Sequence, residues 1–168
     1  MEYMRVGICS DTHDNLALAK EAVNYFETNG VDAVLHCGDI VSPFTAMCFD
    51  GEFSFHATRG NNDGEWELAS TVERFGTYHG EAAHLQYDDM DIAMYHGTSE
   101  QLVDSLCQSG VYDIVARGHT HEHGYENRNG TIHLNPGGLP ITGADGTYHV
   151  AIVETESAAV EFKQVNAP

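Results

Sequence analysis

Basic residues are scarce in this sequence. Seven lysine and arginine residues stand against 26 aspartate and glutamate residues, and the formal net charge is −19 at pH 7. Binding to nucleic acid or to an anionic membrane depends on basic groups that displace counterions. The composition therefore argues against a nucleic-acid duplex or an anionic membrane as a partner.

Long apolar runs and paired cysteines are also absent. No apolar run approaches the ~20 residues of a membrane helix, and the first residues contain no basic segment followed by an apolar one. Cys9, Cys37, Cys48 and Cys107 show no CxxC spacing, which argues against a zinc ribbon and a disulfide framework. We therefore expect a cytoplasmic protein without a membrane segment, whose cysteines are reduced and mostly buried.

The acidic excess suggests an adaptation to salt. A strongly anionic surface repels itself at ordinary salt, whereas molar salt shortens the Debye length to ~3 Å and screens that repulsion. We therefore hypothesise a halophilic-type acidic surface suited to a salt-rich cytoplasm. The alternative is an acidic mesophilic protein. Unfolding midpoints that fall as KCl rises from dilute to molar would contradict the hypothesis.

The pattern of apolar residues predicts the secondary structure. At 168 residues the chain fits one domain, 1–168, and neither a linker nor an internal repeat divides it. Strands are predicted at 4–9, 33–37, 53–57, 82–87, 91–96, 112–116, 148–154 and 159–165, with a further hairpin across Asn129-Gly130. Helices are predicted from Leu16 to the stop at Gly30 and at 43–47, 65–76 and 100–109, with Ser42 and Ser99 as N-caps. Helices in the first two thirds and hairpins towards the end favour an α/β (α+β) protein in which two sheets pack face to face.

The segment RGHTHEH (117–123) follows the predicted strand 112–116 and carries His119, His121 and His123 at alternate positions. Residues two apart share a face of an extended chain. Imidazole is the commonest metal ligand, so these histidines either serve two metal ions or lie in solvent. The segment alone does not decide between the two.

Four other polar clusters follow predicted strands, at the ends where sites of α/β sheets gather. Each has an ordinary structural explanation, because aspartate caps helices, asparagine fills turns and histidine can be satisfied in an interior. Five clusters in one chain argue for a shared site. Its members are Asp11 and His13 in SDTHDN, Asp39 in HCGDI, Asn61 in RGNND, His96 in YHG, and His119 and His121 in GHTH.

This combination of side chains suits two metal ions. Four imidazole nitrogens, two carboxylates and one amide oxygen can hold two divalent ions if one carboxylate bridges them, and we expect Asp39 to be the bridge. Glycines next to Asp39, Asn61, His96 and His119 would let the backbones approach closely. Two ions outweigh two ligand carboxylates in charge, so the site would attract a phosphate ester within an anionic protein.

The ordered motifs Asp-x-His, Gly-Asp, Gly-Asn, His-Gly and Gly-His-x-His span residues 11–121 and resemble those of the calcineurin-like metallophosphoesterase superfamily. The chain is most similar to the small prokaryotic phosphodiesterase branch, whose closing Asn-Pro-Gly resembles NPGG (135–138). The resemblance implies a four-layer αββα sandwich of two mixed sheets with helices on both outer faces. It also implies a binuclear centre, with Asp11, His13, Asp39 and His121 on one ion and Asp39, Asn61, His96 and His119 on the other.

Metal-dependent hydrolysis of phosphoesters, phosphodiesters above all, follows from such a centre. Two ions ~3.5 to 4 Å apart lower the pKa of a bridging water, hold the phosphate oxygens and stabilise an in-line displacement by the bridging hydroxide. We therefore expect the catalytic residues to be Asp39, Asn61, Asn62 and His96. Manganese is the metal we expect, and nickel, iron, zinc, cobalt or magnesium also suit these ligands.

Asn62 occupies the position where much of the superfamily has a histidine that protonates the leaving group. A neutral amide cannot donate a full proton, so alkoxide leaving groups should react poorly, whereas aryl-type groups depart unaided. His123, His56 and His79 are candidates for a substitute donor, and each is also explained as a surface or packed histidine.

Other functions stay open at the level of sequence. One is a protein-interaction scaffold, as in a retromer subunit of similar fold, and another is metal storage or sensing. Homo-oligomers are common in the branch, but the sequence determines neither the oligomeric state nor the identity of the small phosphoester substrate. Trp66, the only tryptophan, is expected to pack against its helix rather than to form a stacking platform.

Overall fold

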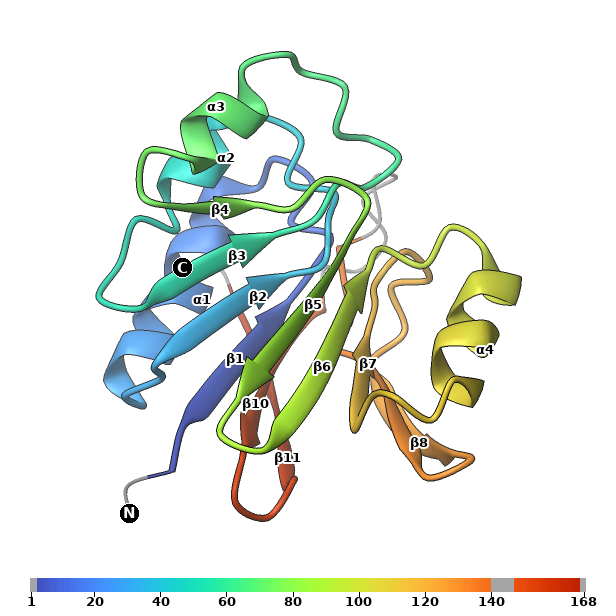
Figure 1. The fold of residues 1–168 in the computed structure, drawn as a ribbon. Helices are drawn as coiled ribbons and strands as arrows, with labels where there is room; N and C mark the ends of the chain where they lie inside the picture. The colour runs from blue at the N-terminus through green and yellow to red at the C-terminus, as the bar shows by residue number, and fades with distance from the viewer. Residues whose placement is uncertain (1–2, 140–146, 167–168) are drawn as a thin grey trace.

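Two β-sheets and four helices make up the described part of the chain, residues 3–139 and 147–166 of a computed structural model (Figure 1). The strands are β1 (Arg5–Cys9), β2 (Ala33–His36), β3 (Ser54–Ala57), β4 (Gly76–Tyr78), β5 (Ala82–Tyr87), β6 (Met90–Tyr95), β7 (Ile114–Ala116), β8 (Gly124–Arg128), β9 (Thr131–Asn135), β10 (Tyr148–Glu154) and β11 (Val160–Val165). The helices are α1 (Leu16–Thr28), α2 (Pro43–Met47), α3 (Leu68–Val72) and α4 (Glu100–Gln108).

Both sheets are mixed. The first has the order β11-β10-β1-β2-β3-β4, with β1 to β4 parallel and β10 antiparallel to both neighbours. The second has the order β5-β6-β7-β9-β8, in which β6, β7 and β9 are parallel and the hairpin partners β5 and β8 are antiparallel. The parallel strands of each sheet therefore end at a common edge.

The sheets face each other across an apolar core. Val6, Ile8 and Leu35 of the first sheet pack against Ile92 and Leu134 of the second, and all five are buried. On the outer face of the first sheet, α1 contacts β10 and β11, and α3 contacts β4; on that of the second sheet, α4 contacts β7 and β9. The predicted four-layer αββα sandwich is confirmed.

The segment 65–76 differs from its prediction. The helix covers only Leu68–Val72, and Gly76 begins a strand that the sequence pattern did not reveal. Gly76 pairs with Phe55 of β3, and a Cβ at Gly76 would lie 2.5 Å from the Phe55 carbonyl oxygen. Close pairing with β3 therefore ends the helix early. Trp66 precedes the helix with 83% of its surface exposed, so the expectation that it packs against the helix is wrong.

The predicted helix caps and cysteine states have mixed outcomes. Ser99 caps α4 through its hydroxyl, which accepts from Leu102 N at 3.4 Å. Ser42 makes no such cap and instead donates to Asp14 Oδ1. All four cysteines are free, and only Cys48 is partly accessible, as expected. Within the described residues, no helix combines the length and apolar character needed to cross a membrane.

Candidate metal centre

The loops that follow β1, β2, β3, β6 and β7 carry the seven predicted metal ligands. Because these strands run parallel within their sheets, their carboxyl ends meet at one end of the sandwich. The structure brings all seven side chains into one connected group, which we call the metal centre. Its members are Asp11, His13, Asp39, Asn61, His96, His119 and His121.

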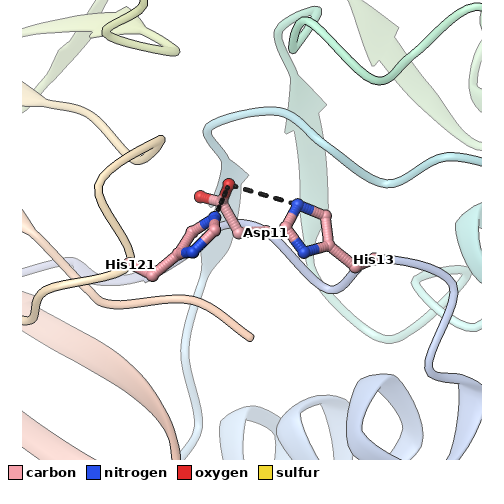
Figure 2. Close-up of side chains that lie close together, drawn as sticks. All are labelled: Asp11, His13 and His121. Carbon is pink, nitrogen blue, oxygen red and sulfur yellow. Dashed lines mark ion pairs between the residues drawn. The ribbon is translucent and has the colours of Figure 1, made fainter. Parts of the chain in front are cut away.

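Asp11 lies at the inner end of the metal centre and is fully buried. Its Oδ1 lies 3.2 Å from His121 Nε2 and 3.5 Å from His13 Nε2, and the two imidazoles face the carboxylate from different loops (Figure 2). Its Oδ2 accepts hydrogen bonds from the Ser10 hydroxyl and from the backbone N–H of His119 at 3.0 Å. One oxygen thus anchors the carboxylate and leaves the other facing the imidazoles.

Asp39 lies between the two predicted ligand sets. Its Oδ2 is 3.0 Å from His13 Nε2 and 3.4 Å from His96 Nε2. Asn62 holds both oxygens of the same carboxylate, because its backbone N–H donates to Oδ1 and its side-chain amide donates to Oδ2, both at 2.8 Å. Asp39 thus approaches histidines of both predicted ligand sets, and its bridging role stays a prediction.

Asn61 and two histidines complete the second set. Asn61 Oδ1 lies 2.9 Å from His96 Nε2 and 3.0 Å from His119 Nδ1. His96 Nδ1 donates to the carbonyl oxygen of Cys37 at 2.7 Å, which directs Nε2 towards the oxygens of Asn61 and Asp39. Acceptor oxygens around His96 Nε2 favour a cation at that nitrogen, either a proton on the ring or a metal ion.

The residues present fit metal ions. Among the described residues, Asp11 Oδ1 and His13 Nδ1 are buried atoms that form no hydrogen bond. Two groups have ligand atoms close enough to share one ion, namely Asp11 with His13 and His121, and Asp11 with Asp39 and His96. Nitrogen and oxygen donors without thiolate suit manganese and its borderline neighbours.

The backbone around the metal centre is strained. Asp11, His13, Asp39, His119 and His121 all have positive φ, between 42° and 71°. Such conformations cost roughly 1–3 kcal/mol each for non-glycine residues and are found where a site demands them. Two glycines give the remaining room: a Cβ at Gly60 would lie 2.1 Å from Asp39 Oδ1, and one at Gly118 would lie 2.3 Å from Asp11 Oδ2.

Two supporting residues were missed at the sequence level. The buried Asp63 carboxylate accepts from the backbone N–H groups of Asp39, Gly60 and Val41, which ties the loops after β2 and β3 together. The buried Arg117 donates to the carbonyl oxygens of Gly97 and Gly118, next to His96 and His119. Both lie within the quoted segments RGNND and RGHTHEH, but only the folded chain shows which groups they bind.

The three histidines predicted as possible proton donors, His56, His79 and His123, are not among the seven residues of the metal centre. His56 Nδ1 and His79 Nε2 are 2.9 Å apart and form a mutual hydrogen bond. His123 stacks on His149 with ring centroids 3.8 Å apart. The role of each as a donor stays a prediction.

Burial and neighbouring charges shift the pKa values of side chains in the metal centre. Burial alone would lower the pKa of His13 and His96, but hydrogen bonds to Asp39 and the charges of Asp11 and Asp39 raise both values. Burial alone would raise the pKa of Asp39, but its hydrogen bonds to His13 and His96 keep it well below the ordinary value. Burial lowers the pKa of His36, beneath the metal centre, to about 3.

These shifts predict how stability depends on pH in protein prepared without metal. A raised histidine pKa gives stability that is complete below the unfolded value of about 6.5 and is lost as pH rises through the folded value, as for His13 and His96. A lowered histidine pKa removes stability as pH falls below about 6.5. This second group comprises His36, His56, His79, His119, His133 and His149.

We therefore expect the free energy of unfolding to be greatest near pH 6.5 and to fall on both sides between pH 5 and 8. Urea denaturation across this range measures it. Added metal should remove the decline above pH 6.5, because a metal ion replaces the protons on His13 and His96. A free energy that rises steadily up to pH 8 without metal would contradict the expectation.

Comparison with known proteins agrees with this geometry. Residues 4–158 match the model of the calcineurin-like phosphoesterase superfamily domain. The chain belongs to the calcineurin-like phosphoesterase superfamily. It is 34% identical to a phosphodiesterase of Methanocaldococcus jannaschii over 83% of this chain and 91% of the relative, and 26% identical to a probable metallophosphoesterase of Methanothermobacter thermautotrophicus over 98% and 95%.

Two solved structures show the same fold. The structure of a novel archaeal phosphodiesterase superposes with a TM-score of 0.89 at 31% identity, over 96% of this chain and all of that one. Vacuolar protein sorting 29 of Cryptosporidium parvum superposes with a TM-score of 0.69 at 16% identity, over 98% of this chain and all of that one, which shows a shared fold alone. The resemblance to the small prokaryotic branch is confirmed, and the chain is a metal-dependent phosphoester hydrolase of this superfamily.

Proposed function

We propose that this calcineurin-like phosphoesterase is a phosphodiesterase that uses two divalent metal ions. The position of Asp39 carries the proposal, because one of its oxygens lies between His13 and His96, which come from the two ligand sets. Asp11, His13, Asp39 and His121 would hold one ion, and Asp39, Asn61, His96 and His119 the other. Manganese is the first candidate for both positions.

The paired ions would supply Lewis acidity and an activated water for in-line displacement at phosphorus. The chain itself orients the ligands. The Cys37 carbonyl fixes the ring of His96, and the Asn62 amide holds Asp39. Such second contacts set ligand geometry, and losing one typically costs 10- to 100-fold in metal affinity or activity.

The direct test is a hydrolysis screen. Protein loaded separately with manganese, nickel, zinc, cobalt, iron or magnesium would be given bis(4-nitrophenyl) phosphate, alkyl diesters and the matching monoesters, at low and molar KCl. We expect turnover of the aryl diester that depends on metal, with about two ions per chain by elemental analysis. Tight binding of metal without turnover of any ester would favour storage or sensing instead.

Asn62 leads to a prediction about leaving groups. Because its amide supplies no full proton, the rate should fall steeply from nitrophenyl to alkyl diesters of higher leaving-group pKa. Asn62→His should flatten this dependence and raise the rate of alkyl diesters relative to that of nitrophenyl diesters by about 10-fold or more, since general acids contribute about 10²- to 10⁴-fold. The ratio of the two rates separates this effect from any loss of the Asn62 contact with Asp39. Asn62→Gln serves as the control, and equal slopes for Asn62→His and the parent would show that another group donates the proton.

The scaffold alternative is weaker. It relies on a likeness of fold, whereas all seven predicted ligands meet in this chain. We further propose a cytoplasmic enzyme acting on a small phosphoester. Homo-oligomer formation and the salt-adapted surface stay predictions.

A further inference from the structure

Of the seven lysine and arginine residues, Arg117 alone is buried, with 3% of its surface exposed. It directly follows β7 and precedes the segment that carries two predicted metal ligands. A buried charge is costly unless it is paired and hydrogen-bonded. The groups that Arg117 binds must therefore compensate for the water that it loses on folding.

The guanidinium of Arg117 joins two loops of the metal centre. Its Nε donates to the carbonyl oxygen of Gly118 at 2.9 Å, and its Nη2 donates to that of Gly97 at 2.8 Å. Gly97 directly follows His96, and Gly118 directly precedes His119. The backbone N–H of Gly118 also donates to the carbonyl oxygen of His96 at 2.9 Å. The loops after β6 and β7 are thus tied together at the residues beside two predicted ligands.

Gly97 leaves room for the guanidinium. Its φ is 96°, in the region that favours glycine, and a Cβ there would lie 2.6 Å from Arg117 Nε and 2.9 Å from Arg117 Cζ. The buried Asn135 donates to the same Gly118 carbonyl oxygen at 3.2 Å. This close packing leaves the guanidinium little freedom, so a change in its position would move both loops.

Glu100, in the first turn of α4, orients the guanidinium. Its carboxylate accepts from Arg117 Nη2 at 2.6 Å, and within the described residues it is the one carboxylate that forms an ion pair with Arg117. His133 Nε2 lies 3.4 Å from Arg117 Nη1. Burial, and then the charges of Arg128 and Arg117, lower the pKa of His133 to about 4, so its neutral ring can accept there. The negative charge that balances Arg117 therefore comes from Glu100, whose side chain is 58% exposed.

The two predicted ligand sets depend on Arg117 unequally. His96 and His119, which adjoin the carbonyls that it binds, belong to the same predicted set. His13, of the other set, lies in the loop after β1, and its backbone N–H donates to the carbonyl oxygen of Asp39 at 3.1 Å. That loop is thus fixed by other contacts, and Arg117 would act on one predicted ion more than on the other.

We propose that Arg117, oriented by Glu100, is a positioning residue that holds His96 and His119 in the geometry needed by one of the two metal ions. The proposal rests on the proposed two-metal function and assigns to one ion two residues outside the metal centre. A group that orients a metal ligand typically changes metal affinity by about 10- to 100-fold. Because Arg117 acts through the backbone, we expect an effect at the lower end of this range.

Titration of the metal-free protein with manganese chloride, followed by the EPR signal of unbound manganese, measures the two binding steps. Arg117→Met removes the donors and should weaken one step by about tenfold and the other by less than about twofold. Glu100→Ala should weaken the same step by about threefold, because a partly exposed ion pair contributes less. Glu100→Gln keeps an acceptor oxygen and should weaken that step less than Glu100→Ala does.

Arg128→Met and Asp104→Asn are the matched controls. Asp104 also lies on α4 and pairs with Arg128 at 2.9 Å, but the other partner of Arg128 is Glu126 rather than a loop of the metal centre. Both controls should bind manganese as the parent does. Equal weakening of both steps, the same weakening in the controls, or unchanged binding in Glu100→Ala would overturn the proposal. Glu100→Ala also decides the question if Arg117→Met does not fold.

Histidine-ring NMR of the metal-free protein separates this proposal from the proposed function. The ring signals of His96 and His119 should shift in Glu100→Ala, whereas those of His13 should not. If the parent binds no manganese, the two-metal function fails, and these signals still decide whether Arg117 positions the rings. Signals of His96 and His119 that match those of the parent would then refute the proposal.

Discussion

Asp39→Asn should reduce phosphodiester hydrolysis by at least about 10³-fold in kcat/KM. One oxygen of this carboxylate lies 3.0 Å from His13 Nε2 and 3.4 Å from His96 Nε2, and these histidines belong to the two predicted ligand sets. An amide has the same size but carries no charge, and its NH₂ group would face the donor amide of Asn62 or the imidazoles. Losing a bridging ligand removes both the electrostatic clamp and the activated water that paired ions provide.

Steady-state kinetics with bis(4-nitrophenyl) phosphate and elemental analysis of bound metal measure this effect together. The loss of activity should accompany a loss of about one metal ion per chain. Asp89→Asn is the matched control, since Asp89 is exposed on the turn between β5 and β6, at the opposite end of β6 from His96. Unchanged metal content and unchanged rates in Asp39→Asn would refute the ligand assignment.

Gly60→Ala should destabilise the protein and inactivate it. The added methyl group would lie 2.1 Å from Asp39 Oδ1 and 2.3 Å from the Asp39 backbone nitrogen. Contacts this short with backbone cannot be relieved by rotating a side chain, so the loops after β2 and β3 must separate. Forcing an extra methylene into a packed site typically costs about 1–3 kcal/mol. A displacement of about 1 Å at a catalytic centre can cost 10²-fold in rate.

Gly64→Ala provides the control for this substitution. Gly64 lies in the same loop, but a Cβ there would meet no atom within 4 Å. Urea denaturation and turnover of the aryl diester should show Gly64→Ala close to the parent, and Gly60→Ala with a lower free energy of unfolding and at least about 10²-fold less activity. Equal behaviour of the two variants would mean that the loops are not packed as described.

Much of the fold follows from local pattern. The strands β1, β2 and β6, the helix α4 with its cap Ser99, and the hairpins at Asp88-Asp89 and Asn129-Gly130 were predicted, because apolar period, caps and turn residues act over a few positions. The seven predicted ligands also meet, because each follows a strand whose carboxyl end lies at the same edge. Their role as ligands stays a prediction until metal is measured.

Elsewhere, tertiary contacts override local pattern. The apolar periodicity of 65–76 predicts a helix throughout. Gly76, however, begins β4 and pairs closely with Phe55 of β3, so the helix ends after Val72. Ser42 precedes a proline, which predicts a cap, but its hydroxyl accepts no hydrogen bond from the helix and instead donates to Asp14 Oδ1 in another loop. Such choices depend on partners that are distant in sequence and cannot be read from a window of neighbouring residues.

The sequence by itself determined the chemistry of this protein, because the types of donor side chain and their order after successive strands need no coordinates to be recognised. Only the tertiary structure decided how those donors are held. The three hydrogen bonds of Asp63 to the loops, those of the buried Arg117 to Gly97 and Gly118, and the ring contacts of His123 with His149 and Phe162 all join segments far apart in the chain. Packing of two sheets brings those segments together, and distances across that packing are not encoded in any short stretch of residues.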